Sequence, residues 1–238
     1  MGQNHLLRLP EALFFDLDGT LLDSLPGIQH SIVAAFRECN LPMADIEVRS
    51  LIGPPIRTIL SRLMLSATAE NEESCLDRLE RAFRVSYDSE GWQKTYHYSD
   101  AATMLRKIKA QGVILFVISN KPRHVSLNIL EAEGTLAYFD EVVTRDSRQP
   151  PYLDKEEMLS SLLSVRRIRP EKCLMVGDTM EDASAAAAVG MQFCLMTHGY
   201  GDVPIGSKIP VTLRLGNFAE LMDVLDRSVP MVGRGVQD

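Results

Sequence analysis

Short apolar runs that alternate with amphipathic stretches constrain the fold of this 238-residue chain more than any other feature. Each run is followed by polar residues or glycine. The runs cover residues 12–17, 113–118, 141–143, 173–176 and 192–196. Strands that are apolar on both faces are typical of parallel sheets buried beneath helices. Helical patterns lie at 100–111, 122–133, 155–166 and 180–189. We therefore predict an α/β fold with a doubly wound parallel sheet.

The stretch 22–93 departs from this alternation, because it contains helical patterns and no strand-like run. These patterns lie at 27–39, 45–51, 54–66 and 70–90. We interpret 22–93 as an inserted α-helical cap domain, with 1–21 and 94–238 forming the α/β core. Near the other end we expect an edge strand at 211–215, a last helix at 218–226 and a frayed end at 233–238.

Composition excludes several classes of function. The net charge of -7 gives no general attraction to nucleic acid or to an anionic membrane surface. No apolar run approaches the length that spans a bilayer, and the first residues lack a signal-peptide pattern. The four cysteines are widely spaced, without a zinc-binding pattern, and are expected to be reduced. We expect a cytoplasmic protein with no nucleic-acid or membrane partner.

Two carboxylates, Asp16 and Asp18, follow the first apolar run in the segment Asp16-Leu17-Asp18-Gly19-Thr20. Open parallel sheets bind their ligands at the carboxyl ends of the strands. Two neighbouring carboxylates repel each other unless a cation lies between them, and Mg²⁺ prefers such oxygen ligands. A solvated acidic turn is the alternative for this motif taken alone, although the apolar lead-in argues against it.

A second acidic pair, Asp178 and Asp182, follows the run at 173–176. Their spacing of four residues places both on one side of a helical turn. Capping of that helix by Asp178 is the alternative, and it would explain one of these carboxylates.

Two further segments offer groups that could bind an anion. Ser119 and Asn120 lie between the strand at 113–118 and Pro122, which is suited to a first helical turn. An ordinary N-cap by Asn120 is the alternative. Lys155 is expected at the first position of its helix. A cation there is repelled by the positive end of the helix dipole, which costs roughly 0.3–1 kcal/mol of stability. A buried anionic site would offset that cost, and Lys121 is the competing candidate for the cation.

Taken in order, these segments resemble the motifs of the haloacid dehalogenase superfamily, and among its phosphatases the phosphoglycolate phosphatase-like branch with a helical cap. The resemblance spans nearly the whole chain. It rests on 16–21, 119–122, Lys155 and 177–182, together with 52–55 in the cap and 197–200. One motif departs from the pattern: many relatives have Lys-Pro-x-Pro, whereas Lys155 is followed by two glutamates.

The resemblance implies a Mg²⁺-dependent phosphatase acting on a small phosphorylated metabolite. Asp16 would be the covalent nucleophile and Asp18 the general acid and base. Ser119, Asn120 and Lys155 would bind the phosphoryl oxygens. The metal would be held by Asp16, Asp18 through its backbone carbonyl, Asp178 and Asp182. Either a monomer or a homodimer is compatible with this family.

Other activities remain open at this stage. A β-phosphoglucomutase-like phosphotransferase would have the same core residues. A 2-haloacid dehalogenase resembles relatives that lack the second aspartate, so Asp18 argues against it. A non-catalytic binding protein is the remaining alternative. Arg57 could bind a substrate carboxylate, as in phosphoglycolate, or be an ordinary surface arginine.

Overall fold

The computed structural model describes residues 9–65 and 72–228 and contains a six-stranded parallel sheet. Its strands are β1 (Ala12–Phe15), β4 (Ile114–Ser119), β5 (Glu141–Thr144), β6 (Cys173–Gly177), β7 (Gln192–Met196) and β8 (Leu213–Leu215). The order across the sheet is β5-β4-β1-β6-β7-β8, so β1 lies where the direction of winding reverses. Such a reversal opens a crevice at the carboxyl ends of the central strands.

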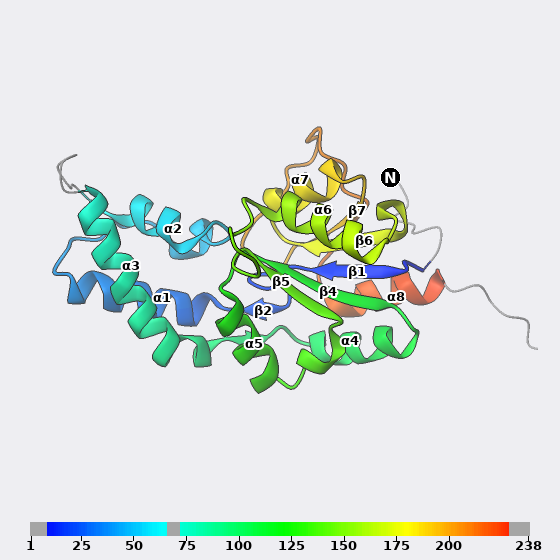
Figure 1. Cartoon of the computed structure of the whole chain (residues 1–238), viewed down its shortest axis with the longest axis horizontal. Helices are drawn as coiled ribbons and strands as arrows, with labels where there is room; N and C mark the ends of the chain where they lie inside the picture. The colour runs from blue at the N-terminus through cyan, green and yellow to red at the C-terminus, as the bar shows by residue number, and fades with distance from the viewer. Residues whose placement is uncertain (1–8, 66–71, 229–238) are drawn as a thin grey trace, which may run out of the picture.

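Helices cover both faces of the sheet (Figure 1). One face packs against α4 (Ala101–Ala110), α5 (Arg123–Ala132) and α8 (Phe218–Arg227), and the other against α6 (Lys155–Arg166) and α7 (Met180–Ala188). Side chains alternate along β1, with Leu13 and Phe15 in the first of these layers and Phe14 in the second. All three are fully buried, which explains the uninterrupted apolar run. The predicted doubly wound α/β fold is confirmed.

The helical insert after β1 is also confirmed. It contains α1 (Leu25–Glu38), α2 (Ile56–Leu63) and α3 (Glu72–Ser89), which extend from the end of the core toward which β1 points (Figure 1). The helix expected at 45–51 is only a 3₁₀ turn, Val48–Leu51. A seven-residue stretch gains too few hydrogen bonds to offset the entropy of starting a helix. The other 3₁₀ turns are Gly91–Lys94, Leu136–Tyr138 and Pro170–Lys172.

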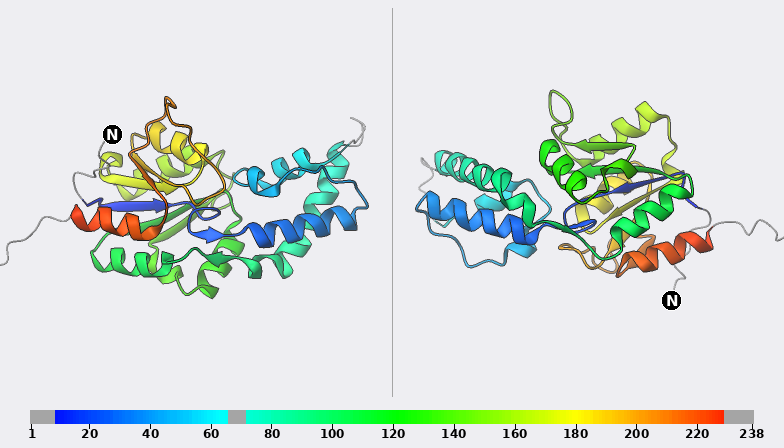
Figure 2. Two further views of the ribbon diagram at one scale, coloured as in Figure 1. Left: turned by 180° about the vertical axis from the view of Figure 1, so that it is seen from behind. Right: turned by 90° about the horizontal axis from the view of Figure 1, so that it is seen from below.

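A two-stranded antiparallel sheet, which was not expected, joins the insert to the core. It pairs β2 (Leu22–Asp23) with β3 (Tyr96–His97), so the two chain crossings lie side by side (Figure 2). Beside it, α1 packs closely on the turn that begins at Gly91. A Cβ on Gly27 would lie only 2.2 Å from the Gly91 carbonyl oxygen. Both crossings are therefore held together at one place.

Some expectations fall outside the described residues: the frayed end at 233–238, the last residue of the helix at 54–66 and the first two of the helix at 70–90. Within 9–65 and 72–228, none of the helices combines the length and the apolar character needed to cross a membrane.

Candidate active site

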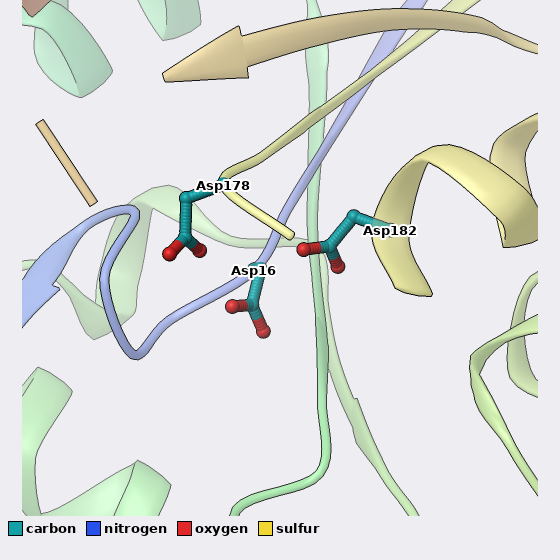
Figure 3. Close-up of side chains that lie close together, drawn as sticks. All are labelled: Asp16, Asp178 and Asp182. Atoms are coloured by element: carbon teal, nitrogen blue, oxygen red, sulfur yellow. The ribbon is translucent and has the colours of Figure 1, made fainter. Parts of the chain in front are cut away.

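Three aspartates converge at the carboxyl edge of the sheet (Figure 3). Asp16 directly follows β1, Asp178 follows β6, and Asp182 lies in the first turn of α7. Because β1 and β6 are neighbours in the sheet, residues far apart in sequence meet here. One oxygen from each carboxylate lies within 4.8 Å of the others. Asp16 is 4% exposed and the other two are fully buried, so this is not a solvated acidic turn.

Lys155 neutralises part of this charge. It is the first residue of α6, where Asp154 caps the helix by accepting from the Glu157 backbone N–H at 2.9 Å. Its ammonium lies 2.8 Å from Asp16 Oδ1 and 2.6 Å from Asp182 Oδ1. Burial opposes its charge, but Asp16 and Asp182 outweigh burial and hold the pKa of Lys155 above its ordinary value. The anionic surroundings expected for this residue are therefore present.

Asp178 is held in place by hydrogen bonds to both of its oxygens. The Thr20 hydroxyl donates to Oδ1 at 3.0 Å. The backbone N–H groups of Tyr200 and Gly201 donate to Oδ2 at 2.7 and 3.2 Å. Thr20 follows Asp16 and Asp18 in the sequence, so this hydrogen bond joins the first acidic segment to the second.

Two glycines allow the backbone to approach Asp178 closely. A Cβ on Gly19 would lie 2.4 Å from Asp178 Oδ2, and the φ of +88° at Gly19 also disfavours any side chain. A Cβ on Gly199 would lie 2.2 Å from the Cβ of Asp178. Neither position has room for an alanine while Asp178 keeps its place.

Asp182 is oriented by the start of α7. Thr179 is the N-cap: its hydroxyl donates to Asp182 Oδ2 at 2.6 Å, and its backbone N–H donates to the same oxygen at 3.1 Å. Thr179 and Asp182 thus form a capping box. The capping role considered for Asp178 is filled by Thr179 instead, which leaves Asp178 free to face the other two aspartates.

The electrostatics of the cluster suit a hard cation. Burial raises the pKa of Asp16 well above its ordinary value; Lys155 opposes this effect, and Asp182 and Asp178 add to it. Burial and the neighbouring Asp182 raise the pKa of Asp178 to about 6. Three buried carboxylates that share one lysine retain negative charge, and oxygen ligands are those that Mg²⁺ and Ca²⁺ prefer. The residues therefore fit a divalent metal ion.

Metal binding should depend on pH. The pKa of Asp178 is raised in the folded state, so the folded protein retains a proton that the unfolded chain loses between about pH 4 and pH 6. Without metal, stability therefore falls as the pH rises through this range. A divalent cation such as Mg²⁺ would compete with that proton. We expect saturating Mg²⁺ to raise Tm by about 5 °C at about pH 7.5 and by much less at about pH 5. Thermal unfolding with Mg²⁺ or EDTA at both pH values measures this difference, and equal shifts would contradict it.

Asp18 lies apart from the three clustered carboxylates. Its side chain is 18% exposed and accepts from the Lys121 ammonium at 2.8 and 3.1 Å. Burial lowers the pKa of Lys121, but Asp18 outweighs burial, so the pKa lies above its ordinary value. The two lysines that competed for one role thus have separate partners: Lys155 pairs with Asp16 and Asp182, and Lys121 with Asp18.

Ser119 and Asn120 both lie at this edge, although their contacts differ. Ser119 ends β4, next to β1 in the sheet, and is 1% exposed; its hydroxyl oxygen accepts from the Lys121 backbone N–H at 3.3 Å. The side-chain amide of Asn120 donates to both carboxylate oxygens of Glu181, at 2.9 and 3.1 Å, and to the Gly53 carbonyl of the insert at 3.2 Å. Asn120 is therefore a bridge to the insert, not an N-cap: Pro122 occupies that position of α5.

Residues 13–196 match the family of haloacid dehalogenase-like hydrolases. The chain belongs to this family. A curated relative, phosphoglycolate phosphatase 1 of Pseudomonas aeruginosa, is 30% identical over 94% of this chain and 83% of its own. The tyrosine-protein kinase PtkA of Mycobacterium tuberculosis is 30% identical over 86% of this chain and 68% of its own.

A solved structure supports the same fold. A haloacid dehalogenase-like family protein from Streptococcus pneumoniae superposes with a TM-score of 0.78, covering 91% of this chain and 98% of its own. Its sequence identity of 21% means that this likeness concerns the fold alone.

In this hydrolase an arginine of the insert contacts the loop that holds Asp178. Arg49 donates to the backbone carbonyls of His198 and Gly199 at 3.1 and 2.8 Å, and its guanidinium carbon lies 5.2 Å from the centre of the Tyr200 ring. The next two backbone N–H groups along this loop are those that bind Asp178. Arg49 of the insert and Asp178 of the core therefore both bind the backbone of one short loop.

Removing this contact should lower activity without unfolding the hydrolase. Hydrogen bonds from a charged donor contribute about 1.5–3 kcal/mol each. We expect Arg49→Met to lower kcat/KM by about tenfold or more. Arg57→Met is the matched control, because among the described residues Arg57 pairs only with Glu73, Asp77 and Glu80, all within the insert. Steady-state kinetics and thermal unfolding of both variants measure this. An equal loss of activity in the two variants would show that the contact with the core is unimportant.

The geometry also assigns partners to residues that sequence reasoning passed over. Glu181 and Arg49 were not singled out, and Lys121 was considered only as a competitor of Lys155. The sequence could have indicated Lys121, because it directly follows Ser119-Asn120 and so lies at the carboxyl end of a central strand, where ligands bind. Arg49 lies in the insert, and no local pattern indicates that it reaches a loop 150 residues away.

Proposed function

We propose that this hydrolase is a Mg²⁺-dependent phosphatase that cleaves a small phosphomonoester through an aspartyl-phosphate intermediate. The observation that carries the proposal is the buried cluster of Asp16, Asp178 and Asp182 around Lys155, at the edge of the sheet where Asp18 also lies. The phosphatase named among the relatives supports the same chemistry.

Asp16 supplies the nucleophile in this proposal. One of its carboxylate oxygens forms a bond to phosphorus, and the bond between phosphorus and the leaving-group oxygen breaks. Asp18, which carries a proton at this stage, gives it to that oxygen as it departs and becomes a carboxylate. Water then attacks the phosphorus of the aspartyl-phosphate, Asp18 takes a proton from the water, and phosphate and free Asp16 result. Lys121, bonded to both oxygens of Asp18, keeps this carboxyl group in position for both transfers.

Three groups are proposed to bind the phosphoryl oxygens: Ser119, Asn120 and Lys155. Positioning and neutralisation of charge dominate phosphoryl transfer, because the protein contributes little covalent chemistry beyond the nucleophile. Lys155 supports this assignment through its distance of 2.8 Å from Asp16 Oδ1. Asn120 would have to exchange its hydrogen bonds to Glu181 for one to the substrate.

The metal would be held by Asp16, Asp178 and the backbone carbonyl of Asp18, with Asp182 bound directly or through water. When bound, Mg²⁺ would neutralise part of the charge of the phosphoryl group and of these carboxylates. The acidic cluster described above fits this group.

We further propose that 22–93 act as the cap domain, excluding water and selecting the leaving group when the cap closes on the core. The contacts of Arg49 and of Asn120 with the opposite part of the chain support such a closed state. A small phosphorylated metabolite is the expected substrate, and the name of the Pseudomonas relative makes phosphoglycolate a compound to test.

A transferase of the β-phosphoglucomutase type and a 2-haloacid dehalogenase are the alternatives. Asp18, held by a buried lysine at the site, favours a phosphatase over a dehalogenase, since halide needs no proton to depart. Phosphate release without a bisphosphate activator distinguishes hydrolysis from transfer.

The test measures inorganic phosphate released from small phosphoesters by the purified chain, with Mg²⁺ or with EDTA. We expect release only with Mg²⁺, and without any bisphosphate activator. Phosphate release that required such an activator would favour a mutase. Chloride release from 2-chloropropionate would favour a dehalogenase. A complete lack of phosphate release across the panel would overturn the proposal.

A further inference from the structure

A cavity of about 80 Å³ lies between the insert and the core, next to Asp18. On the core side it is lined by Asp18, Asn120 and Lys121. One end of the cavity therefore meets the residue to which the proposed function assigns the proton of the leaving group. The leaving group of a bound phosphoester would extend from that end toward the insert.

The wall formed by the insert is mostly apolar. It includes the side chains of Ile28, Ile52, Ile56, Ile59 and Phe83. Contact with aliphatic and aromatic side chains removes apolar ligand surface from water, which makes the free energy of binding more favourable. They offer no hydrogen bonds to replace those that the hydroxyl groups of a sugar would lose. The chemistry of this wall therefore selects against a polyhydroxylated leaving group.

One cation interrupts the apolar wall. Arg84, on α3, lines the cavity, and its only acidic contact among the described residues is Glu80, at 3.5 Å. Glu80 is shared with Arg57, which lies closer at 3.1 Å. The charge of Arg84 is therefore only partly compensated. An anionic group on the ligand would complete its pairing.

A second polar group in this wall, the Tyr87 hydroxyl, makes no hydrogen bond to any residue that the structure describes, although it lies near the Lys121 ammonium. Tyr87 lines the cavity and is 2% exposed, and within the described part of the chain its hydroxyl has no hydrogen-bond partner. Its ring lies 4.9 Å from the Lys121 ammonium, beside the core end of the cavity. A buried hydroxyl that makes no hydrogen bond costs stability. A ligand oxygen near Lys121 would remove this cost by forming a hydrogen bond with the Tyr87 hydroxyl.

We infer that the leaving group is an apolar alcohol or phenol that carries a single anionic group at its far end. The apolar wall contacts its body, and Arg84 binds the anionic end. Arg84 is thus the specificity-determining residue of the cavity. This inference rests on the proposed phosphatase function.

The test compares kcat/KM with Mg²⁺ for 4-carboxyphenyl phosphate, phenyl phosphate, phosphoglycolate and glucose 6-phosphate. We expect phenyl phosphate to exceed glucose 6-phosphate by about tenfold or more, and the carboxylate to add about another tenfold. Phosphoglycolate, which has little apolar surface, should fall below 4-carboxyphenyl phosphate. A preference for glucose 6-phosphate or phosphoglycolate would overturn the inference while leaving the phosphatase proposal intact. A lack of phosphate release from all four would contradict the proposed function itself.

Variants separate the roles within the cavity. Arg84→Met should remove the preference for the carboxylate, so that 4-carboxyphenyl phosphate and phenyl phosphate are hydrolysed with similar kcat/KM. Arg81→Met, on the same helix but exposed outside the cavity, is the control and should keep the preference. Tyr87→Phe should lower kcat/KM several-fold while leaving Tm unchanged or higher, because it removes a buried hydroxyl without a partner. A preference retained in Arg84→Met would overturn the role of Arg84, and unchanged kcat/KM in Tyr87→Phe would overturn that of the hydroxyl.

Discussion

Replacing Asp16 with asparagine is expected to lower phosphate release by about 10⁴-fold or more, because an amide cannot form the covalent phosphoenzyme. The same change should leave folding intact. Asparagine retains an oxygen that can accept from Lys155, and it removes one of three carboxylates that repel each other in a buried site. Steady-state phosphate release and thermal unfolding measure the two effects separately.

Asp226→Asn is the matched control for this change. Asp226 is exposed at the end of α8 and contacts Gln111, so its replacement should alter neither activity nor Tm. Acid quenching during turnover should trap phosphate on the unmodified protein and none on Asp16→Asn. Full activity in the Asp16 variant would show that another group attacks phosphorus.

Replacing Lys155 with methionine is expected to lower both stability and activity. Lys155 is 2% exposed and bridges Asp16 and Asp182. Loss of one member of a buried ion pair costs about 3–5 kcal/mol, because the remaining charges are left unpaired. In EDTA at neutral pH, we expect the free energy of unfolding to fall by about that amount, with a smaller loss at lower pH, where the carboxylates take up protons. With Mg²⁺, kcat should fall by about 10²–10³-fold.

Lys172→Met serves as the control, because Lys172 forms an exposed ion pair with Glu11 and such pairs contribute about 0–1 kcal/mol. Lys155→Arg is informative if the methionine variant fails to fold. Arginine retains the positive charge but lacks the compact ammonium group. Lys155→Arg should therefore restore most of the lost stability and less of the lost kcat. Unchanged unfolding of Lys155→Met in EDTA would contradict the view that Lys155 neutralises the aspartate cluster.

The layered core could be predicted from the sequence because its strands are buried on both faces. Phe14 and Phe15 point to opposite layers and are both fully buried, so β1 appears as an unbroken apolar run. Less regular parts could not be predicted. The β2–β3 pair has only two residues in each strand, too few for a pattern, and it depends on the two chain crossings meeting in space. The stretch at 45–51 has helical character but is too short to form more than a 3₁₀ turn.

For the site, the sequence by itself determined which residues stand at the carboxyl ends of the central strands. Asp16, Asp178, Asp182, Ser119 and Lys155 could be named because each follows an apolar run or begins a helix, which are local properties. Their catalytic and ligand-binding roles remain predictions that the variants above test.

Only the tertiary structure decided which of these residues pair. Lys155 was the preferred candidate cation and Lys121 its competitor, and the fold places Lys155 against Asp16 and Lys121 against Asp18. It also directs Asn120 to Glu181 and Arg49 to the loop beside Asp178. Each of these contacts joins segments far apart in the chain. A local pattern specifies where a side chain leaves the backbone, whereas its partner depends on how strands, helices and insert pack together.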